Sequence, residues 1–225
     1  MESVMAHMDL PSCPDGLQLV QSKDGLTLVG TDGLELRGDF TRLLPRLRPS
    51  AVRNELLVKA ARVKGIHSPV VVDATAGLGE DSLLLAAAGC VVTLYERDAV
   101  IAALLADALE RATHTNELRK AAGRMKLVKG DAVAGLRQMA SSPDVVYLDP
   151  MFPGRRKSAA VKKKLQLMQR LERPCDNEQE LMEAAFSAGP RKVVVKRPAK
   201  GPFLADAKPS YTLAGKAVRF DVYVR

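Results

Sequence analysis

The sequence predicts an α/β protein whose main body is a doubly wound, mostly parallel seven-stranded sheet, preceded by a small N-terminal β appendage. From residue 70 onward, short runs of β-branched residues alternate with helical segments, which is typical of parallel strands covered on both faces. Residues 17–40 instead alternate apolar and polar positions around two Asp-Gly pairs, a pattern typical of antiparallel hairpins. A last apolar pair, 210–214 and 217–224, has no helix between its members and is expected to form a hairpin at the sheet edge.

The chain length favours one principal domain with an appendage. Its 225 residues can bury one sizeable core, and because aromatic residues make up only 4%, that core must consist largely of Val, Leu and Ala. We expect residues 1–48 to form the β-hairpin appendage and a connector, and residues 49–225 to form the main domain. The connector, 41–50, carries two prolines and three arginines, and it should lead into a helix over 50–63.

Each strand of the main domain should be followed by a helix. The predicted strands are 70–74, 91–95, 125–129, 144–148 and 191–196, and the predicted helices lie near 81–88, 98–112, 132–140, 158–171 and 178–188. In open sheets of this kind, ligands bind beyond the carboxyl ends of the strands. Four successive strands are followed there by an acidic residue, namely Asp73, Glu96, Asp131 and Asp149. Because a run of four is unusual, the pattern predicts a site at this edge.

The charge and cysteine content restrict the partners. A formal net charge of +8 with a pI near 9.5 indicates a polyanionic partner, although a solvated basic face is the alternative. Three scattered cysteines with no CxxC pair indicate neither a disulfide framework nor a zinc site, so no metal is expected. No apolar run reaches the length of a membrane span and the first residues lack a hydrophobic leader, so we expect a cytoplasmic protein without a membrane partner.

The glycine-rich stretch "DATAGLGEDS" (73–82) is a strand-to-helix turn that suits a nucleotide-like ligand. Glu96 lies nineteen residues beyond Gly77, near the spacing at which an acidic residue binds a ribose diol. Both a dinucleotide and S-adenosylmethionine contain that ribose. A tight turn without any ligand is the alternative.

The residues that open the next helix favour S-adenosylmethionine. Ser82 occupies the position of the third glycine that dinucleotide sites use for close helix packing. Glu80 and Asp81 would repel a pyrophosphate, whereas S-adenosylmethionine carries a sulfonium and an ammonium against one carboxylate. The electrostatics therefore favour the methyl donor as cofactor.

Each candidate cofactor-binding residue has an expected role. Asp73 stands at the strand end, Gly77 and Gly79 allow close backbone approach, Glu80 with Asp81 faces the methionine end, and Glu96 binds the ribose hydroxyls. Asp131 would accept a hydrogen bond from the adenine amine, Gly130 would leave room for the ring, and Arg97 would flank it. Simple helix capping is the alternative for Asp81 and Asp131.

The stretch "LDPMFP" (148–153) suits methyl transfer to an amine of a nucleobase. Such an amine is a poor nucleophile because its lone pair is delocalised, so a catalyst must accept its hydrogen bonds and aim the lone pair. Asp149 and the carbonyl of Pro150 can accept these bonds, and Phe152 can stack on the base. Asp149 would act either as a base or as a hydrogen-bond acceptor only. A strand-ending turn with a core phenylalanine is the alternative.

Ordered blocks between residues 70 and 224 carry a resemblance to a known family. They are "VVDATAGLGEDS", "LYERD", "VVYLDPMFP" with "KSAAVKKK", and "RKVVVKRP" with "RFDVYV". Together they resemble the bacterial ribosomal RNA small subunit methyltransferase J family, guanine-N2 methyltransferases that depend on S-adenosylmethionine. The most specific block is "LDPMFP", followed by "KSA" and later by "VVKRP".

The resemblance implies a class I methyltransferase fold, which is Rossmann-like, and N2-methylguanosine in 16S RNA as the product. It also implies that Glu80-Asp81, Glu96-Arg97, Gly130-Asp131 and Asp149 contact the cofactor. The chain departs from the better-known Asn-Pro-Pro-Tyr amino-methyltransferases, because Asp149, Met151 and Phe152 replace three of those residues.

The basic segments would then hold RNA phosphates beside the base pocket, with 16S RNA or the 30S subunit as partner. The residues assigned to this contact are Arg155, Arg156, Lys157, Lys196 and Arg197. Two alternatives stay open. The same donor could serve an adenine N6 or a protein glutamine, or the chain could be a non-catalytic RNA-binding or ribosome-assembly protein with a methyltransferase-like fold.

Overall fold

The central sheet has seven strands in the order β6-β5-β4-β7-β8-β10-β9 in a computed structural model that describes residues 10–150, 167, 171 and 177–225. The strands are β4 (Val70–Asp73), β5 (Val91–Glu96), β6 (Met125–Lys129), β7 (Val145–Leu148), β8 (Lys192–Pro198), β9 (Tyr211–Ala214) and β10 (Val218–Val224). The first five pair in parallel, whereas β10 runs antiparallel to both β8 and β9. The predicted fold class and the closing hairpin are confirmed.

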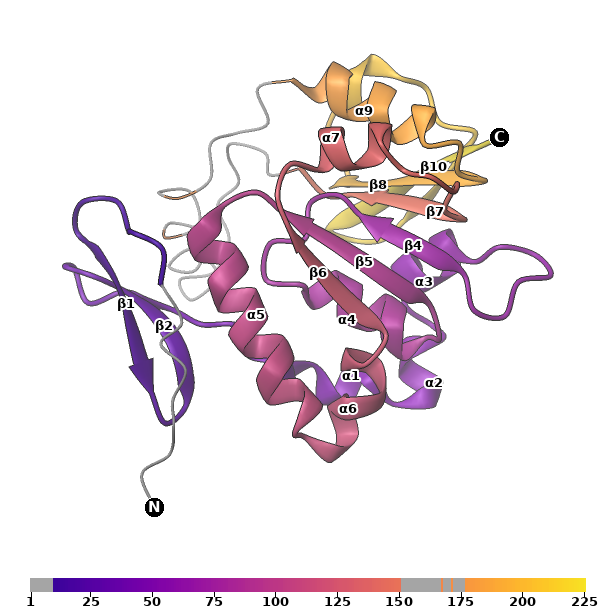
Figure 1. Cartoon of the computed structure of the whole chain (residues 1–225). Helices are drawn as coiled ribbons and strands as arrows, with labels where there is room; N and C mark the ends of the chain where they lie inside the picture. The colour runs from indigo at the N-terminus through magenta and orange to yellow at the C-terminus, as the bar shows by residue number, and fades with distance from the viewer. Residues whose placement is uncertain (1–9, 151–166, 168–170, 172–176) are drawn as a thin grey trace.

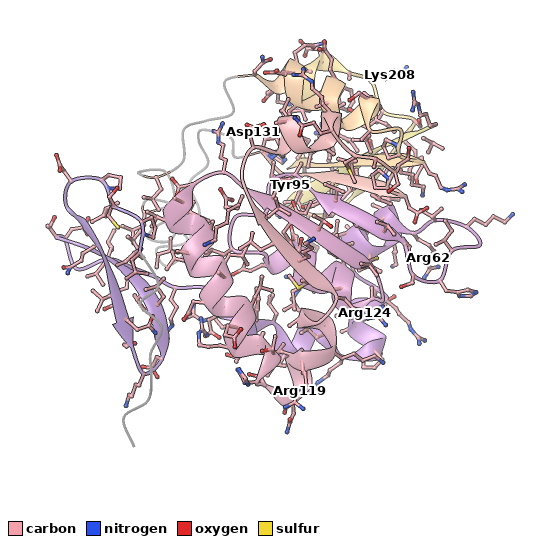
Figure 2. All side chains as sticks on the ribbon, viewed as in Figure 1. Arg62, Tyr95, Arg119, Arg124, Asp131 and Lys208 are labelled. Atoms are coloured by element: carbon pink, nitrogen blue, oxygen red, sulfur yellow. The ribbon has the colours of Figure 1, made fainter. Side chains whose placement is uncertain are left out.

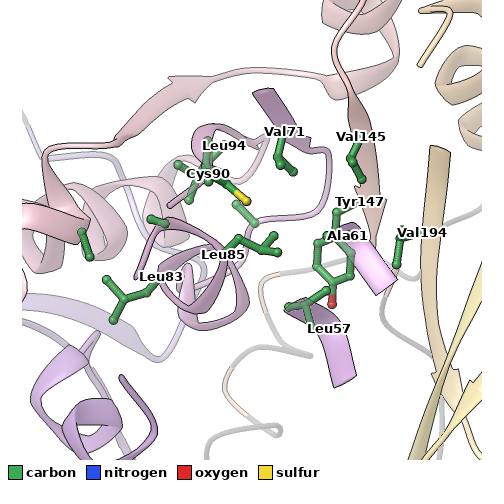
Figure 3. Packing of buried hydrophobic residues seen from close by; sticks show 14 of the residues in the cluster. Leu57, Ala61, Val71, Leu83, Leu85, Cys90, Leu94, Val145, Tyr147 and Val194 are labelled. Atoms are coloured by element: carbon green, nitrogen blue, oxygen red, sulfur yellow. The ribbon is translucent and has the colours of Figure 1, made fainter. Parts of the chain in front are cut away.

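Helices cover both faces of the sheet (Figure 1). One face packs against α3 (Leu56–Ala61), α4 (Glu80–Ala87), α5 (Ala99–Thr113) and α6 (Asn116–Ala122), and the other packs against α7 (Ala132–Arg137) and α9 (Glu178–Ser187). Successive side chains of a strand point to opposite faces, so Val71 and Val145 join the first core and Val72 and Val146 the second. Figure 3 shows part of the first core. Burial on both faces explains why these strands are continuous runs of valine.

The connector region differs from the prediction. A single helix over 50–63 was wrong, because the chain forms α2 (Pro49–Val52) and α3 with a break between them. The amide of Asn54 donates to the Ser50 carbonyl at 2.9 Å, and Glu55 is extended with φ −58° and ψ 131°. Such a side-chain bond competes with the helical backbone. The preceding residues form the short helices η1 (Phe40–Leu43) and α1 (Leu44–Leu47).

Some of the remaining helices were predicted from the sequence and others were not. Those near 81–88, 98–112, 132–140 and 178–188 are confirmed as α4, α5, α7 and α9, whereas α6 and the short helix η2 (Leu204–Asp206) were not expected. The helix expected over 158–171 lies outside the described residues except for Leu167 and Leu171.

The N-terminal strands form a separate antiparallel sheet of β1 (Leu17–Ser22), β2 (Gly25–Gly30) and β3 (Glu35–Leu36). Ser22 pairs with Gly25, so the turn residues are Lys23 and Asp24 rather than the Asp-Gly pair itself. The second Asp-Gly pair lies within the next turn, where Gly33 has φ +72°, a backbone conformation that favours glycine.

This small sheet packs on α5 rather than standing alone (Figure 1). Leu26, Leu28 and Leu36 are fully buried and share one apolar cluster with Ile101 and Leu104 of α5. On the other side, Val20 of β1 is 38% exposed. The sheet therefore turns an apolar face toward α5, whereas β1 is partly exposed to solvent on the other side. In the part of the chain that the structure describes, no helix is both long and apolar enough to span a bilayer.

Candidate functional site

The loop between β4 and α4 is tied to the strands on both sides. The backbone N–H of Ala74 donates to the Tyr147 carbonyl at 3.0 Å, and that of Ala76 donates to the Tyr95 carbonyl at 3.1 Å. At Gly79, with φ +73°, a Cβ would come within 2.7 Å of Cδ1 of Leu105. Only glycine therefore lets the first turn of α4 approach α5 this closely.

Asp73, at the end of β4, fixes this loop through hydrogen bonds of its side chain. Its side chain is buried, and its carboxylate accepts hydrogen bonds from the Ser82 hydroxyl at 2.6 Å and from the Thr75 backbone N–H at 3.0 Å. Burial raises the pKa of Asp73 to about 7, and the nearby charges of Asp81 and Asp149 act in the same direction. Ser82, which breaks the dinucleotide pattern, thus has a defined task that the sequence did not reveal.

Glu96 ends β5 with both carboxylate oxygens already hydrogen-bonded. Oε2 accepts from the Gly77 backbone N–H at 2.9 Å and Oε1 accepts from that of Asp98 at 2.8 Å. The residue is buried, and burial raises the pKa of its carboxyl. A carboxylate offers about four lone-pair sites, so each oxygen can accept one further bond. That capacity matches the two hydroxyls of a ribose diol.

Gly130 and Asp131 follow β6 at the same edge. The Gly130 backbone N–H donates to the Glu96 carbonyl at 2.9 Å, and none of the described atoms lies within 4 Å of the place a Cβ would take. Asp131 is exposed and caps α7 by accepting from the Ala134 N–H at 3.0 Å. Figure 2 shows Asp131 in the upper half of the view and Arg119 at the bottom. The space beside Gly130 is compatible with a planar ring.

A cluster of two carboxylates, a lysine and a tyrosine connects α4, β7 and β8. Oδ2 of Asp81 accepts from the Tyr147 hydroxyl and from Nζ of Lys196, both at 2.6 Å. The same ammonium donates to Oδ2 of Asp149 at 2.8 Å. The backbone N–H of Asp149 donates to the Thr75 hydroxyl at 2.6 Å, which ties the cluster to the glycine loop.

The charges of this cluster support one another. Burial alone would lower the pKa of Lys196, but Asp149 and Asp81 together raise it well above its ordinary value. Burial would raise the pKa of Asp81, yet the Lys196 ammonium and the Tyr147 hydroxyl bring it below its ordinary value. Burial and the same carboxylates raise the pKa of Tyr147 well above 10.0, so its hydroxyl stays a donor. The lysine and Asp81 are both charged near neutral pH.

The structure brings together most of the residues that the sequence singled out. Asp73, Glu96 and Asp149 lie at the carboxyl ends of adjacent parallel strands, and Asp81 is bonded into the same region from α4. Glu80 stands in the first turn of α4, Arg97 directly follows Glu96, and Pro150, the residue after Asp149, is buried. The predicted contacts of Phe152, Arg155, Arg156 and Lys157 lie outside the described residues.

Two expected phosphate-binding cations have other surroundings. Lys196 points into the carboxylate cluster, whereas Arg197, next along the strand, points to the opposite face, where it is 1% exposed. Its Nε donates to the Pro202 carbonyl at 2.9 Å and its Nη1 lies 3.7 Å from Oε1 of Glu178. A guanidinium buried in this way cannot reach an RNA phosphate, so the expectation for Arg197 is corrected.

Two residues of the site were missed, although one of them carried a signal. Tyr147 lies two positions before Asp149, so the two-residue period of a strand places both side chains on one face. Thr75 gave no such signal, because its contact with Asp149 joins the loop after β4 to the residue after β7, far away in the sequence. Among the described residues no group of three or more His, Cys, Asp or Glu side chains could hold a metal ion.

Comparison with known proteins places this site in a family context. The model of a family of S-adenosylmethionine-dependent methyltransferases matches residues 5–225. Ribosomal RNA small subunit methyltransferase J from Thioalkalivibrio sulfidiphilus is 44% identical, with 99% of this chain and 92% of that protein covered. The protein of the same name from Pseudoalteromonas atlantica is 46% identical, with 93% and 85% covered.

A solved structure agrees with these relatives. The crystal structure of a methyltransferase from Neisseria gonorrhoeae that depends on S-adenosylmethionine has a TM-score of 0.75 to this chain at 35% identity. The match covers 95% of this chain and 85% of that one. The residues that the family model matches, 5–225, include the glycine loop, the acidic strand ends and the N-terminal sheet.

Proposed function

Since the chain belongs to the ribosomal RNA small subunit methyltransferase J family, we propose that it transfers a methyl group from S-adenosylmethionine to the exocyclic N2 of a guanine in 16S ribosomal RNA. The observation that carries this proposal is the position of Asp149. Its carboxylate follows β7 at the edge where the glycine loop and Glu96 also lie, and its backbone is bonded to Thr75 of that loop.

The chemistry of this edge fits the cofactor. S-adenosylmethionine supplies an electrophilic methyl group on a positively charged sulfur. Among the described residues, the carboxylates of Asp81 and Glu96 lie beside its expected position, and their negative charge favours such a cation. A pyrophosphate would meet repulsion from the same groups.

Each part of the cofactor has a proposed binding partner. Glu96 accepts hydrogen bonds from the ribose hydroxyls, and Gly77 and Gly79 let the backbone come close. The space beside Gly130 takes the adenine ring, with Asp131 accepting from its amine and Arg97 at its flank. Asp81, with Glu80 beside it, faces the ammonium of the methionine end.

Asp149 and Pro150 would hold the guanine amine. The Asp149 carboxylate accepts one N2–H bond and the Pro150 carbonyl accepts the other, so the nitrogen lone pair points along the line of attack. With the donor bound, the N2 lone pair would form the new N–C bond while the electron pair of the C–S bond returns to sulfur, which leaves a neutral thioether. One N2 proton would pass to the Asp149 carboxylate that accepts its hydrogen bond, and from there to solvent. Asp149 stands where it can stabilise the positive charge that develops on N2.

The remaining assignments concern the RNA and the N-terminal sheet. We keep Arg155, Arg156 and Lys157, which follow Asp149 in the sequence, as proposed contacts to RNA phosphates. We also propose that residues 1–48 form an appendage packed on α5 and that residues 49–225 form the catalytic domain. The RNA of the small ribosomal subunit is the proposed partner, and that substrate implies a cytoplasmic protein.

The direct test uses 30S particles from cells that lack the homologous enzyme. The purified protein is incubated with these particles and a donor carrying a labelled methyl group, and the 16S RNA is digested to nucleosides. N2-methylguanosine should be the labelled product, and free 16S RNA tested in parallel shows whether the assembled particle is required. Label on adenine N6, label on protein, or no transfer under conditions where the donor binds would overturn the proposal.

A further inference from the structure

We propose that Lys196 reads O6 of the target guanine while Asp149 reads its two N–H groups, which makes Lys196 a specificity-determining residue. The inference rests on the proposed function, because it concerns the base that this site would methylate. Neither the charge pattern of the sequence nor the family resemblance gave Lys196 such a role.

The two side chains form one composite hydrogen-bonding surface. Nζ of Lys196 lies 2.8 Å from Oδ2 of Asp149, and the side chains are 25% and 35% exposed. Their polar ends are thus partly open to solvent. They also follow directly after Leu148 and Val195, which are paired in register on the parallel strands β7 and β8. Rigid neighbouring strands therefore fix the spacing between acceptor and donor.

Guanine presents a matching edge. Its N2–H and N1–H groups are adjacent donors, and O6, an acceptor, comes next. One carboxylate can accept from both N–H groups, as in a fork, and an ammonium beside the carboxylate oxygen nearest N1 can donate to O6. Adenine presents an unprotonated N1 and an amine in place of O6, so it would leave the carboxylate and the ammonium without matching partners.

The donor count of Lys196 agrees with this role. An ammonium has three N–H groups. Asp81 and Asp149 are its acceptors among the described side chains, which leaves one N–H direction for a further acceptor. Asp81 is itself held by the Tyr147 hydroxyl at 2.6 Å. The bond from Lys196 to Asp81 therefore fixes the position of the ammonium, and its bond to Asp149 keeps it beside the carboxylate that would bind the base.

A second reading of Lys196 concerns the methyl donor. Its ammonium could instead bind the carboxylate of the methionine end, since Asp81 belongs to that region of the site. This role and base reading predict different losses in a Lys196 variant. The first would weaken donor binding, and the second would change which bases are methylated.

The experiment compares three bases at the target position. After the methylated guanosine has been mapped, 30S particles are reconstituted with 16S RNA that carries guanine, 2,6-diaminopurine or 2-aminopurine there, introduced by ligation. Both analogues keep the N2 amine, but they lack O6 and the N1 proton. Wild-type enzyme is compared with Lys196→Met, with Lys196→Arg as the conservative variant and with Lys120→Met, which removes an exposed cation from α6.

Base reading predicts a change in discrimination without a change in donor affinity. The wild type and Lys120→Met should prefer guanine over 2,6-diaminopurine by about 100-fold or more in kcat/KM, because Lys196 and Asp149, which the bound base covers, lose their hydrogen-bond partners with the analogue. Lys196→Met should reduce this ratio at least tenfold, and Lys196→Arg should restore part of it. The Kd for S-adenosylmethionine, measured by calorimetry, should stay within about threefold of the wild type.

Several results would overturn the inference. Equal methylation of guanine and 2,6-diaminopurine by the wild type would overturn the inference on its own. The test therefore remains decisive even if Lys196→Met fails to fold. A Lys196→Met enzyme that keeps full discrimination but loses donor affinity would assign the lysine to the cofactor. Failure of the proposed function looks different, because then the wild type would methylate none of these particles at N2.

Discussion

The buried carboxylate of Asp73 should make the fold less stable as the pH rises from about 4 to about 7, and Asp73→Asn should relieve this cost. Asparagine has nearly the same shape: its amide oxygen can accept from the Thr75 N–H, and its NH2 can donate to the Ser82 hydroxyl oxygen, which reverses the direction of the bond that Asp73 now makes there. The substitution therefore removes a charge while it keeps the local hydrogen bonds. The expected effect is a pH-dependent gain in the free energy of unfolding.

The size of this gain follows from the pKa of Asp73. Burial raises the pKa from 3.8 to about 7, so between these values the folded protein binds the proton more tightly than the unfolded chain does. The free energy of unfolding therefore falls as the pH rises through this window. The full cost is on the order of 4 kcal/mol, of which roughly 3 kcal/mol should appear between pH 5 and pH 8.

Urea unfolding at pH 5 and pH 8 measures this effect. Between these two conditions, Asp73→Asn should gain roughly 3 kcal/mol over the wild type. The control is Asp15→Asn, which removes an exposed carboxylate and should follow the wild-type curve. Parallel pH dependences for the wild type and Asp73→Asn would refute the reasoning. If the carboxylate is retained for the cofactor, the more stable variant should also bind S-adenosylmethionine more weakly.

Four further substitutions test other parts of the structure. Glu96→Ala should weaken S-adenosylmethionine binding by about 100-fold in calorimetry, since two charge-assisted hydrogen bonds are lost, while RNA affinity in a filter-binding assay stays unchanged. Asp149→Ala should lower kcat at least about 100-fold with RNA affinity nearly intact, and near-normal turnover would remove Asp149 from its role. Gly79→Ala should lower the free energy of unfolding by about 2 kcal/mol or more, because φ is +73° and Leu105 must move. Leu28→Ala should cost about 2 to 5 kcal/mol in urea unfolding, and no loss would mean that the N-terminal sheet does not pack on α5.

The strands of the main sheet were predictable because burial on both faces demands continuous apolar residues. Runs such as 145–148 and 193–195 leave few other folds that could bury them, and their order along the chain places the acidic residues at one edge. The region of the site followed from this topology alone, before any contact was known.

Other features depend on contacts that a linear pattern does not contain. The break between α2 and α3 arises where the Asn54 side chain bonds the Ser50 carbonyl, which residue composition does not reveal. Lys196 and Arg197 are adjacent cations in the sequence, yet strand geometry sends one into the carboxylate cluster and buries the other. The net charge of the segment counts both residues as equal cations, whereas in the fold Lys196 bonds two carboxylates and Arg197 bonds a backbone carbonyl.

The most direct test of the whole account is a crystal structure of this protein with bound S-adenosylmethionine. The ribose hydroxyls should contact Glu96, the adenine should lie beside Gly130, and the methyl group should face the carboxylate of Asp149. A cofactor bound away from the carboxyl ends of β4, β5 and β7, or one whose methyl group points away from Asp149, would contradict the account.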